Sequence, residues 1–351
     1  MNSLLLQCRP GFEGEAASEI QAHAERLGLS GFARTQASQG WVQWQMDDAA
    51  ACETLMQSVR FAELIFIRQW ARGQFVDLPE KDRLTTLLGA FRAYPRVSQV
   101  WLEVPDTNDG KALASFCKKF QAPLEKGMHK VGCLRANAPL PGRIQLFFLN
   151  SQRVFVGLVE QANAAPWPMG IPRLKFPREA PSRSTLKLEE AWHHFVPREQ
   201  WDDRLAPAMT AVDLGAAPGG WTWQLVQRHM RVTAVDNGPM DKALMDSGLV
   251  DHQRADGYVF EPRKPVDWMV CDIVERPART AWLIEQWLGH GWCREAIVNL
   301  KLPMKTRYAE VQQILARLED FFDDAGARVS IGCKQLYHDR EEVTCHLRRW
   351  N

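Results

Sequence analysis

Apolar and polar residues alternate in short stretches along the first 165 positions, which predicts small strands and helices in mixed order. Strands are expected at 3–8, 40–46, 64–70, 99–104, 143–149 and 153–158, and helices at 14–26 and 109–120. The last two strands flank Asn150 and Ser151, as in a β-hairpin. This mixed α+β pattern is typical of small ferredoxin-like units, and no catalytic cluster stands out in it.

From about position 182 onward, strands and helices alternate more regularly. Strands are expected at 211–214, 231–235, 266–272 and 296–301, helices at 220–230, 280–289 and 309–325, and two final strands at 328–335 and 341–348. Regular alternation predicts a parallel, doubly wound sheet, and the final pair of strands predicts an antiparallel edge. The two halves are separated by 164–181, which holds five prolines and reads as an extended linker.

The composition is that of an ordinary globular protein. The 351 residues are 46% hydrophobic and 24% charged, and no apolar run approaches the ~20 residues of a membrane span. The N-terminus lacks the basic and apolar segments of a signal peptide. Eight cysteines are scattered without a C-x-x-C pair, which argues against a zinc or redox site. We therefore expect a cytoplasmic protein with reduced thiols, without a metal and without a membrane partner.

The charge is unevenly distributed, although the formal net charge is only +1. Positions 111–190 hold 13 Lys and Arg against 5 Asp and Glu, a balance of +8, so the remainder carries −7. Such a block is the footprint of a phosphate-binding face, but a solvated lysine-rich surface would have the same composition. Charge alone leaves both interpretations open.

The sharpest motif is a glycine loop at 210–225, TAVDLGAAPGGWTWQL. A strand leads through Asp213 and Gly215 to Gly219 and Gly220 and then into a helix, which is where an α/β sheet binds ligands. The spacing is not that of a dinucleotide site, G-x-G-x-x-G. It suits S-adenosylmethionine better, because that cofactor has no pyrophosphate and instead presents carboxylate and ammonium groups.

Two further acids follow at the ends of the next predicted strands. Asp236 lies about 20 positions after the loop, where a carboxylate can accept hydrogen bonds from ribose hydroxyls. Asp256 is expected to close the third strand, where it could bind the adenine amino group, although an Asp-Gly turn is an alternative.

A second set of charged residues is predicted at the same edge of the sheet. Asp272 and Lys301 end two strands, Glu342 begins the last strand, and Lys187 lies on a helix just before the sheet begins. Structural ion pairs could explain each residue singly, but the combination is more specific.

These motifs (DLGAAPGGW, KLEEA, CDI, NLKLP and REEV) resemble the FtsJ-like RNA ribose 2′-O-methyltransferases over about 182–351. The resemblance implies a catalytic tetrad of Lys187, Asp272, Lys301 and Glu342, with Lys301 as the base. Glu341 is the neighbouring alternative for the last member, but the family pattern puts the acid directly before valine. At the cofactor the resemblance places these residues: Ser184, Asp213, Gly215, Ala217, Pro218, Gly219, Gly220, Asp236, Asp256 and Asp272.

The complete layout is similar to the branch of that family that methylates a cytidine 2′-hydroxyl in the peptidyl-transferase region of 23S rRNA. This implies a Rossmann-like S-adenosylmethionine-dependent domain preceded by an α+β ferredoxin-like/THUMP region. The expected divisions are a ferredoxin-like unit at 1–60, a THUMP-like RNA-binding domain at 61–163, the linker at 164–181 and the methyltransferase domain at 182–351. The implied partner is 23S rRNA, naked or in an early large-subunit precursor, and we expect a monomer.

The implied chemistry sets a requirement on Lys301. A lysine acts as a base only if its pKa falls from ~10.4. Partial burial and the nearby Lys187 would lower the pKa, whereas Asp272 and Glu342 would orient the lysines and partly restore it.

Other functions remain as alternatives. A cytosine C5-methyltransferase would need a Pro-Cys pair, and an amino-group methyltransferase an Asn/Asp-Pro-Pro-Tyr/Phe motif; the sequence has neither. A nicotinamide oxidoreductase is disfavoured by the loop spacing. A methyltransferase acting on a different RNA, or a non-catalytic RNA-binding ribosome-assembly factor, stays open.

Overall fold

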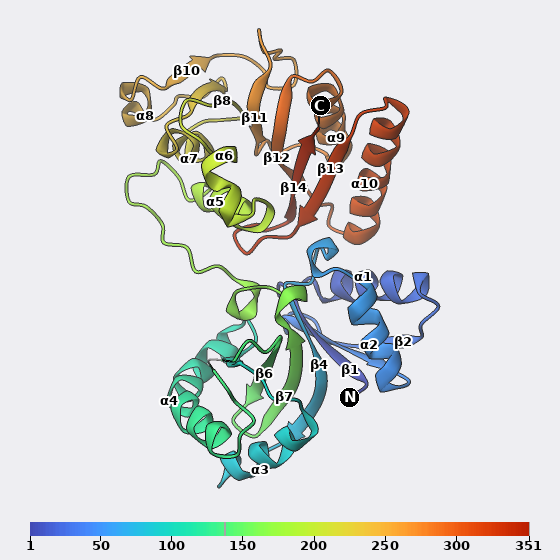
Figure 1. The fold of residues 1–351 in the computed structure, drawn as a ribbon. Helices are drawn as coiled ribbons and strands as arrows, with labels where there is room; N and C mark the ends of the chain where they lie inside the picture. Colours follow the sequence, from blue (N-terminus) through green and yellow to red (C-terminus); the bar gives the residue numbers. More distant parts are fainter. Residues whose placement is uncertain (137, 351) are drawn as a thin grey trace. The chain divides into compact units, whose positions relative to one another are not determined.

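The computed structural model describes residues 1–136 and 138–350, so Asn351, the last residue of the predicted methyltransferase domain, lies outside the described residues. The chain forms two compact units, Met1–Ile171 and Pro172–Asn351 (Figure 1). The division between them falls inside the proline-rich stretch 164–181, where proline interrupts regular hydrogen bonding.

The first unit is built on one seven-stranded sheet, in the order β2-β3-β1-β4-β7-β6-β5. Its strands are β1 (Ser3–Gln7), β2 (Gly31–Arg34), β3 (Trp41–Met46), β4 (Gln69–Asp77), β5 (Gln99–Glu103), β6 (Gly142–Asn150) and β7 (Arg153–Glu160). Because β1 pairs with both β3 and β4, the sheet runs continuously through the segments 1–60 and 61–163. The predicted hairpin at 143–158 is confirmed by the pairing of β6 and β7.

Four α-helices lie in the described residues of this unit, 1–136 and 138–171, and the sequence pattern predicted two of them. They are α1 (Glu13–Arg26), α2 (Ala49–Ser58), α3 (Arg83–Ala90) and α4 (Asn108–Lys130). Helix α4 continues past the predicted end at 120 and contains Pro123. Leu124 and Met128 on its later turns are fully buried, so apolar packing outweighs the cost of the internal proline.

The strand predicted at 64–70 is wrong for most of its length. Strand β4 begins only at Gln69. The backbone N–H groups of Phe66 and Ile67 donate to the buried carboxylate of Glu19, at 3.0 and 3.1 Å, rather than to a neighbouring strand. This segment is apolar because it is buried, and periodicity cannot distinguish a buried loop held by a carboxylate from a buried strand.

The second unit is built on another seven-stranded sheet, in the order β10-β9-β8-β11-β12-β14-β13. Its strands are β8 (Thr210–Leu214), β9 (Arg231–Val235), β10 (Val250–Gln253), β11 (Val266–Cys271), β12 (Cys293–Lys301), β13 (Val329–Lys334) and β14 (Glu342–Arg349). The first five strands in that order are parallel, and β14 is antiparallel to both β12 and β13. The predicted Rossmann-like sheet with an antiparallel edge is therefore confirmed.

The helices of the second unit are α5 (Thr185–Phe195), α6 (Trp201–Arg204), α7 (Gly220–Gln227), α8 (Lys242–Asp246), α9 (Pro277–Gly289) and α10 (Arg307–Asp324). Trp192 of α5, Trp221 of α7 and Trp268 of β11 are buried in one apolar cluster. This packing fixes α5 against the sheet beside α7. The carboxyl ends of the parallel strands meet at one edge of the sheet, where ligands bind in such folds.

Candidate active site

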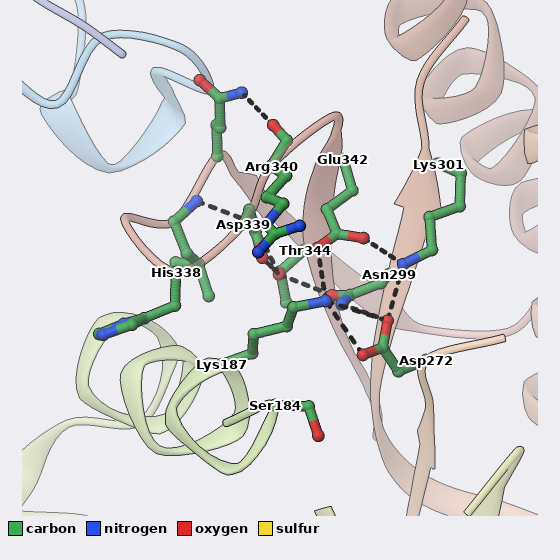
Figure 2. Close-up of polar contacts among 12 residues, drawn as sticks. Ser184, Lys187, Asp272, Asn299, Lys301, His338, Asp339, Arg340, Glu342 and Thr344 are labelled. Carbon is green, nitrogen blue, oxygen red and sulfur yellow. Dashed lines mark hydrogen bonds and ion pairs between the residues drawn. The ribbon is translucent and has the colours of Figure 1, made fainter. Parts of the chain in front are cut away.

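Four charged side chains from four separate segments of the chain meet at this edge (Figure 2). Lys187 Nζ lies 3.0 Å from Asp272 Oδ2 and 2.5 Å from Glu342 Oε1. Lys301 Nζ lies 2.8 Å from Asp272 Oδ1 and also donates to Glu342. The structure thus brings together all four residues of the predicted tetrad.

The local structure explains why they converge. Lys301 and Glu342 face each other as direct partners in the β12–β14 ladder, so the antiparallel register places their side chains side by side. Asp272 directly follows β11, the parallel neighbour of β12. Glu342 is 4% exposed and turned toward the lysines, whereas Glu341 is largely exposed and pairs with Arg307.

The lysines and carboxylates stabilise one another's charged forms. Burial by itself would lower the pKa of Lys301, but the charges of Asp272 and Glu342 and the hydrogen bonds to them outweigh burial, so the pKa is raised. Burial would raise the pKa of Asp272, but Lys187, Lys301 and a hydrogen bond from Asn299 lower it overall. The ammonium form of Lys301 is therefore the resting form of this site.

Glu190, which the sequence did not single out, fixes the loop that leads into β14 and Glu342. Its buried carboxylate on α5 accepts the backbone N–H groups of Tyr337 and His338, at 2.8 and 3.0 Å, and the ring N–H of His338. Burial would raise the pKa of Glu190, but hydrogen bonds from His194 and His338 lower it to about 2. Helix α5 thus supplies Lys187 and, one turn later, the anchor of the β13–β14 loop.

The glycine loop lies between β8 and α7. Gly215 and Gly219 adopt φ angles of +76° and +117°, which favour glycine, and a Cβ atom on Gly219 would overlap with Leu244. Ala217 and Pro218 are joined by a cis peptide bond. Gly220 lies directly against the Ser184 hydroxyl, which shares a hydrogen bond with Ser182.

Three carboxylates accompany this loop. Asp213 is buried and accepts the Thr222 hydroxyl at 2.6 Å; burial, only partly opposed by hydrogen bonds from Thr222, raises its pKa to about 7. Asp236 directly follows β9 and accepts the backbone N–H groups of Ala217 and Gly238, at 3.1 and 2.7 Å. Asp213 therefore steadies the start of α7, and Asp236 shapes the loop from the neighbouring strand.

Asp256 does not close the third strand as predicted. The pairing of β10 with β9 ends at Gln253, and Asp256 lies in the following turn, where its carboxylate accepts the Tyr258 backbone N–H at 2.8 Å. The local Asp-Gly turn chemistry determines the position of this residue.

The residues at this edge fit S-adenosylmethionine in their chemistry. The loop backbone is closely packed around Gly219 and Gly220, and the Asp236 carboxylate lies against the loop, where it can accept hydrogen bonds from ammonium and hydroxyl groups. Within residues 1–136 and 138–350, no three His, Cys, Asp or Glu side chains are grouped in a way that could hold a metal ion. No helix in the same described ranges is long and apolar enough to cross a membrane.

The sheet, the loop and the tetrad define a Rossmann-like, S-adenosylmethionine-dependent methyltransferase of the FtsJ type, and the FtsJ-like methyltransferase model matches residues 180–298. The RlmM ferredoxin-like domain matches residues 1–71, and the N-terminal domain of ribosomal RNA large subunit methyltransferase M matches residues 82–160.

Curated relatives align along nearly the whole chain. Ribosomal RNA large subunit methyltransferase M of Azotobacter vinelandii (strain DJ) is 63% identical over 349 residues, covering 99% of each chain. The proteins of that name from Ectopseudomonas mendocina and Pseudomonas aeruginosa PAO1 are 65% and 63% identical, again covering 99% of each chain. The chain belongs to the ribosomal RNA large subunit methyltransferase M family, which excludes the nicotinamide oxidoreductase alternative.

Proposed function

We propose that this protein methylates the ribose 2′-oxygen of a cytidine in the peptidyl-transferase region of 23S rRNA, with S-adenosylmethionine as donor and Lys301 as base. The observation that carries the proposal is the tetrad, two lysines held by Asp272 and Glu342 beside a glycine loop. The name of the relatives, ribosomal RNA large subunit methyltransferase M, supports ribosomal RNA as the substrate class.

Three groups of residues would hold the cofactor. The loop residues Ala217, Pro218, Gly219 and Gly220, with Ser184 packed against Gly220, would hold its methionine end. Asp236 would bind the ribose hydroxyls and Asp256 the adenine end. Asp213 and Gly215 act through the loop, because Asp213 is buried on Thr222 and Gly215 gives the turn its shape.

The tetrad aligns and deprotonates the hydroxyl. Bound S-adenosylmethionine supplies an electrophilic methyl carbon attached to a positively charged sulfur. Lys301 accepts the hydroxyl proton as the carbon–oxygen bond forms and the methyl–sulfur bond breaks, with its electron pair left on sulfur as a neutral thioether. Lys301 must therefore enter the reaction as the neutral amine. Asp272 and Glu342 hold the Lys301 nitrogen in place from two sides, and Lys187 balances their charge.

RNA contacts come from the basic segment 111–190. On α4, five lysines are exposed: Lys111, Lys118, Lys119, Lys126 and Lys130. Their ammonium groups suit a phosphate backbone. We propose the divisions 1–60, 61–163, 164–181 and 182–351 as functional domains, with 61–163 as a THUMP-like RNA-binding module. The protein acts as a cytoplasmic monomer on naked 23S rRNA or an early precursor.

The direct test is transfer of a labelled methyl group to 23S rRNA taken from cells that lack this gene. The label is mapped by nuclease digestion. Label on one cytidine 2′-oxygen, absent with Lys301→Ala, supports the substrate, the atom and the base together. No label on naked rRNA or precursor particles, with cofactor binding intact, would point instead to another RNA or to a non-catalytic assembly factor.

A further inference from the structure

A chain of hydrogen bonds continues from the tetrad into the protein interior (Figure 2). Asn299 Nδ2 donates to Asp272 Oδ1 at 2.9 Å, and the Thr344 hydroxyl lies 2.8 Å from Asn299 Oδ1. The same hydroxyl lies 3.2 and 3.0 Å from the two carboxyl oxygens of Asp339. Asn299, Thr344 and Asp339 are each 0% exposed, so bulk water does not reach these groups.

The protons along this chain can be assigned by counting donors. The Asp272 carboxylate only accepts, so the Asn299 amide must turn its nitrogen toward Asp272 and its oxygen toward Thr344. The single proton of the Thr344 hydroxyl is then used by Asn299. The contact between Thr344 and Asp339 needs a proton from the other partner, which only a protonated Asp339 can supply.

We propose that Asp339 is a neutral carboxylic acid that fixes, through Thr344 and Asn299, the orientation of the Asp272 carboxylate between the two lysines. Asp339 is thus a positioning residue for methyl transfer, and this inference rests on the function proposed above. Each donor in this chain of hydrogen bonds points toward Asp272. This single orientation is kept only as long as Asp339 holds its proton.

The surroundings of Asp339 favour its neutral form. Complete burial raises its pKa well above the usual value, and the charges of Glu342 on β14 and Glu190 on α5 raise it further. A hydrogen bond from the Leu336 backbone N–H, at 2.9 Å, and the charge of Lys187 oppose this shift in the pKa without cancelling it.

Breaking the chain at Thr344 has a defined consequence at the active site. Without the hydroxyl, Asn299 Oδ1 is a buried acceptor with no donor. The amide is then free to rotate and present its oxygen to Asp272. Asp272 would lose one of its donors and shift, and Lys301, which it holds at 2.8 Å, would shift with it.

The test compares four variants in methyl transfer to 23S rRNA. Thr344→Val removes the hydroxyl at constant shape and should lower kcat about ten- to a hundredfold, with KM for RNA and cofactor unchanged. Thr344→Ser keeps a hydroxyl and Asp339→Asn keeps an N–H donor, so kcat of both variants should remain within about threefold of wild type. Thr280→Val removes a buried hydroxyl that bonds to Tyr258 and to the backbone carbonyl of Arg276, away from the tetrad, and serves as the matched control.

A second measurement does not depend on activity. The infrared C=O stretch of a protonated carboxyl group should be present in the wild-type protein at neutral pH and reduced in Asp339→Asn. Equal carboxyl bands in the two proteins, or full kcat in a folded Thr344→Val, would overturn the inference. If the wild-type protein itself transfers no methyl group, the proposed function fails, while the infrared comparison still decides whether Asp339 is neutral.

Discussion

Lys187 and Lys301 donate to the same two carboxylates, Asp272 and Glu342, although one lysine comes from a helix and the other from a strand end (Figure 2). Positive and negative groups therefore alternate around a closed ring. Removing any one member leaves its neighbours with unbalanced, largely buried charge. Variants within this ring are best interpreted together with a cofactor-binding measurement, which reports on the fold of the site independently of the transfer step.

Replacing the proposed base should separate chemistry from binding. Lys301→Ala is expected to lower kcat by at least about a hundredfold, because the proton acceptor is lost, with cofactor affinity within about threefold of wild type. The measurement is single-turnover transfer together with calorimetric titration of the cofactor. Lys264→Ala, at an exposed position before the amino end of β11, is the control and should retain full activity. Near-wild-type turnover by Lys301→Ala would reject the base assignment.

The rate of transfer should rise with pH. The carboxylates around Lys301 raise its pKa, so the ammonium form dominates near neutrality and the reactive amine increases about tenfold per pH unit. We expect the logarithm of kcat to climb with a slope near one between about pH 6.5 and pH 9. A profile that is flat over this range would show that deprotonation of Lys301 does not limit the reaction.

The glycine loop can be tested at a single position. Gly219→Ala should weaken cofactor binding at least about tenfold, because its φ of +117° disfavours alanine and the new Cβ would overlap with Leu244. Gly248→Ala is the matched control, since Gly248 also has a positive φ, +70°, but has open space around it. It should cost about 1 kcal/mol of stability and leave cofactor affinity unchanged. Equal effects of both variants on affinity would contradict a specific role of the loop.

A buried charge cluster at the opposite end of β12 should matter for stability rather than for catalysis. Glu295 accepts from Arg204 and His346; burial would raise its pKa, but these bonds lower it to about 2. Glu295→Ala should cost about 3–5 kcal/mol in urea unfolding near pH 7, because Arg204 is left buried without its partner.

The depressed pKa of Glu295 gives this cluster a characteristic pH dependence. Its stabilisation is present above the unfolded value of about 4.3 and is lost as the pH falls toward 2. The difference in unfolding free energy between wild type and Glu295→Ala should therefore shrink on acidification. A difference that is independent of pH would contradict the ionic origin of the stabilisation.

Asp339 should show the opposite pH dependence. Its pKa is raised in the folded protein, so its contribution to stability is fully present below the unfolded value of about 3.9 and is lost as the pH rises through the folded value. Asp339→Asn cannot ionise, and its stability relative to wild type should increase from about pH 4 to pH 8. Urea unfolding of both proteins across this range is the measurement. Parallel stability curves would mean that Asp339 has an ordinary pKa.

The local sequence pattern predicted the second sheet except for β10, and it located the site motifs. Strands at 211–214, 231–235, 266–272 and 296–301 were placed nearly correctly, because short apolar runs separated by amphipathic helices are encoded locally. Since parallel strand ends must share one edge, the meeting of Asp272, Lys301 and Glu342 followed from topology. Lys187 was added to them from its position on a helix just before the sheet, and the family resemblance gave it a role in the tetrad.

Only the tertiary structure decided which buried groups bond to one another. The sequence did not reveal that Glu19 accepts hydrogen bonds from the backbone at 65–67, or that Glu190 binds the loop before β14. Nor did it reveal that Asp339 is connected to Asp272 through the side chains of Thr344 and Asn299. Nor could it give the direction of the pKa shift of Lys301, which depends on the balance between burial and two carboxylates. The spacing of apolar residues along the sequence indicates which side of a helix or strand faces the core. A hydrogen bond between residues far apart in the chain depends instead on distances that exist only after folding.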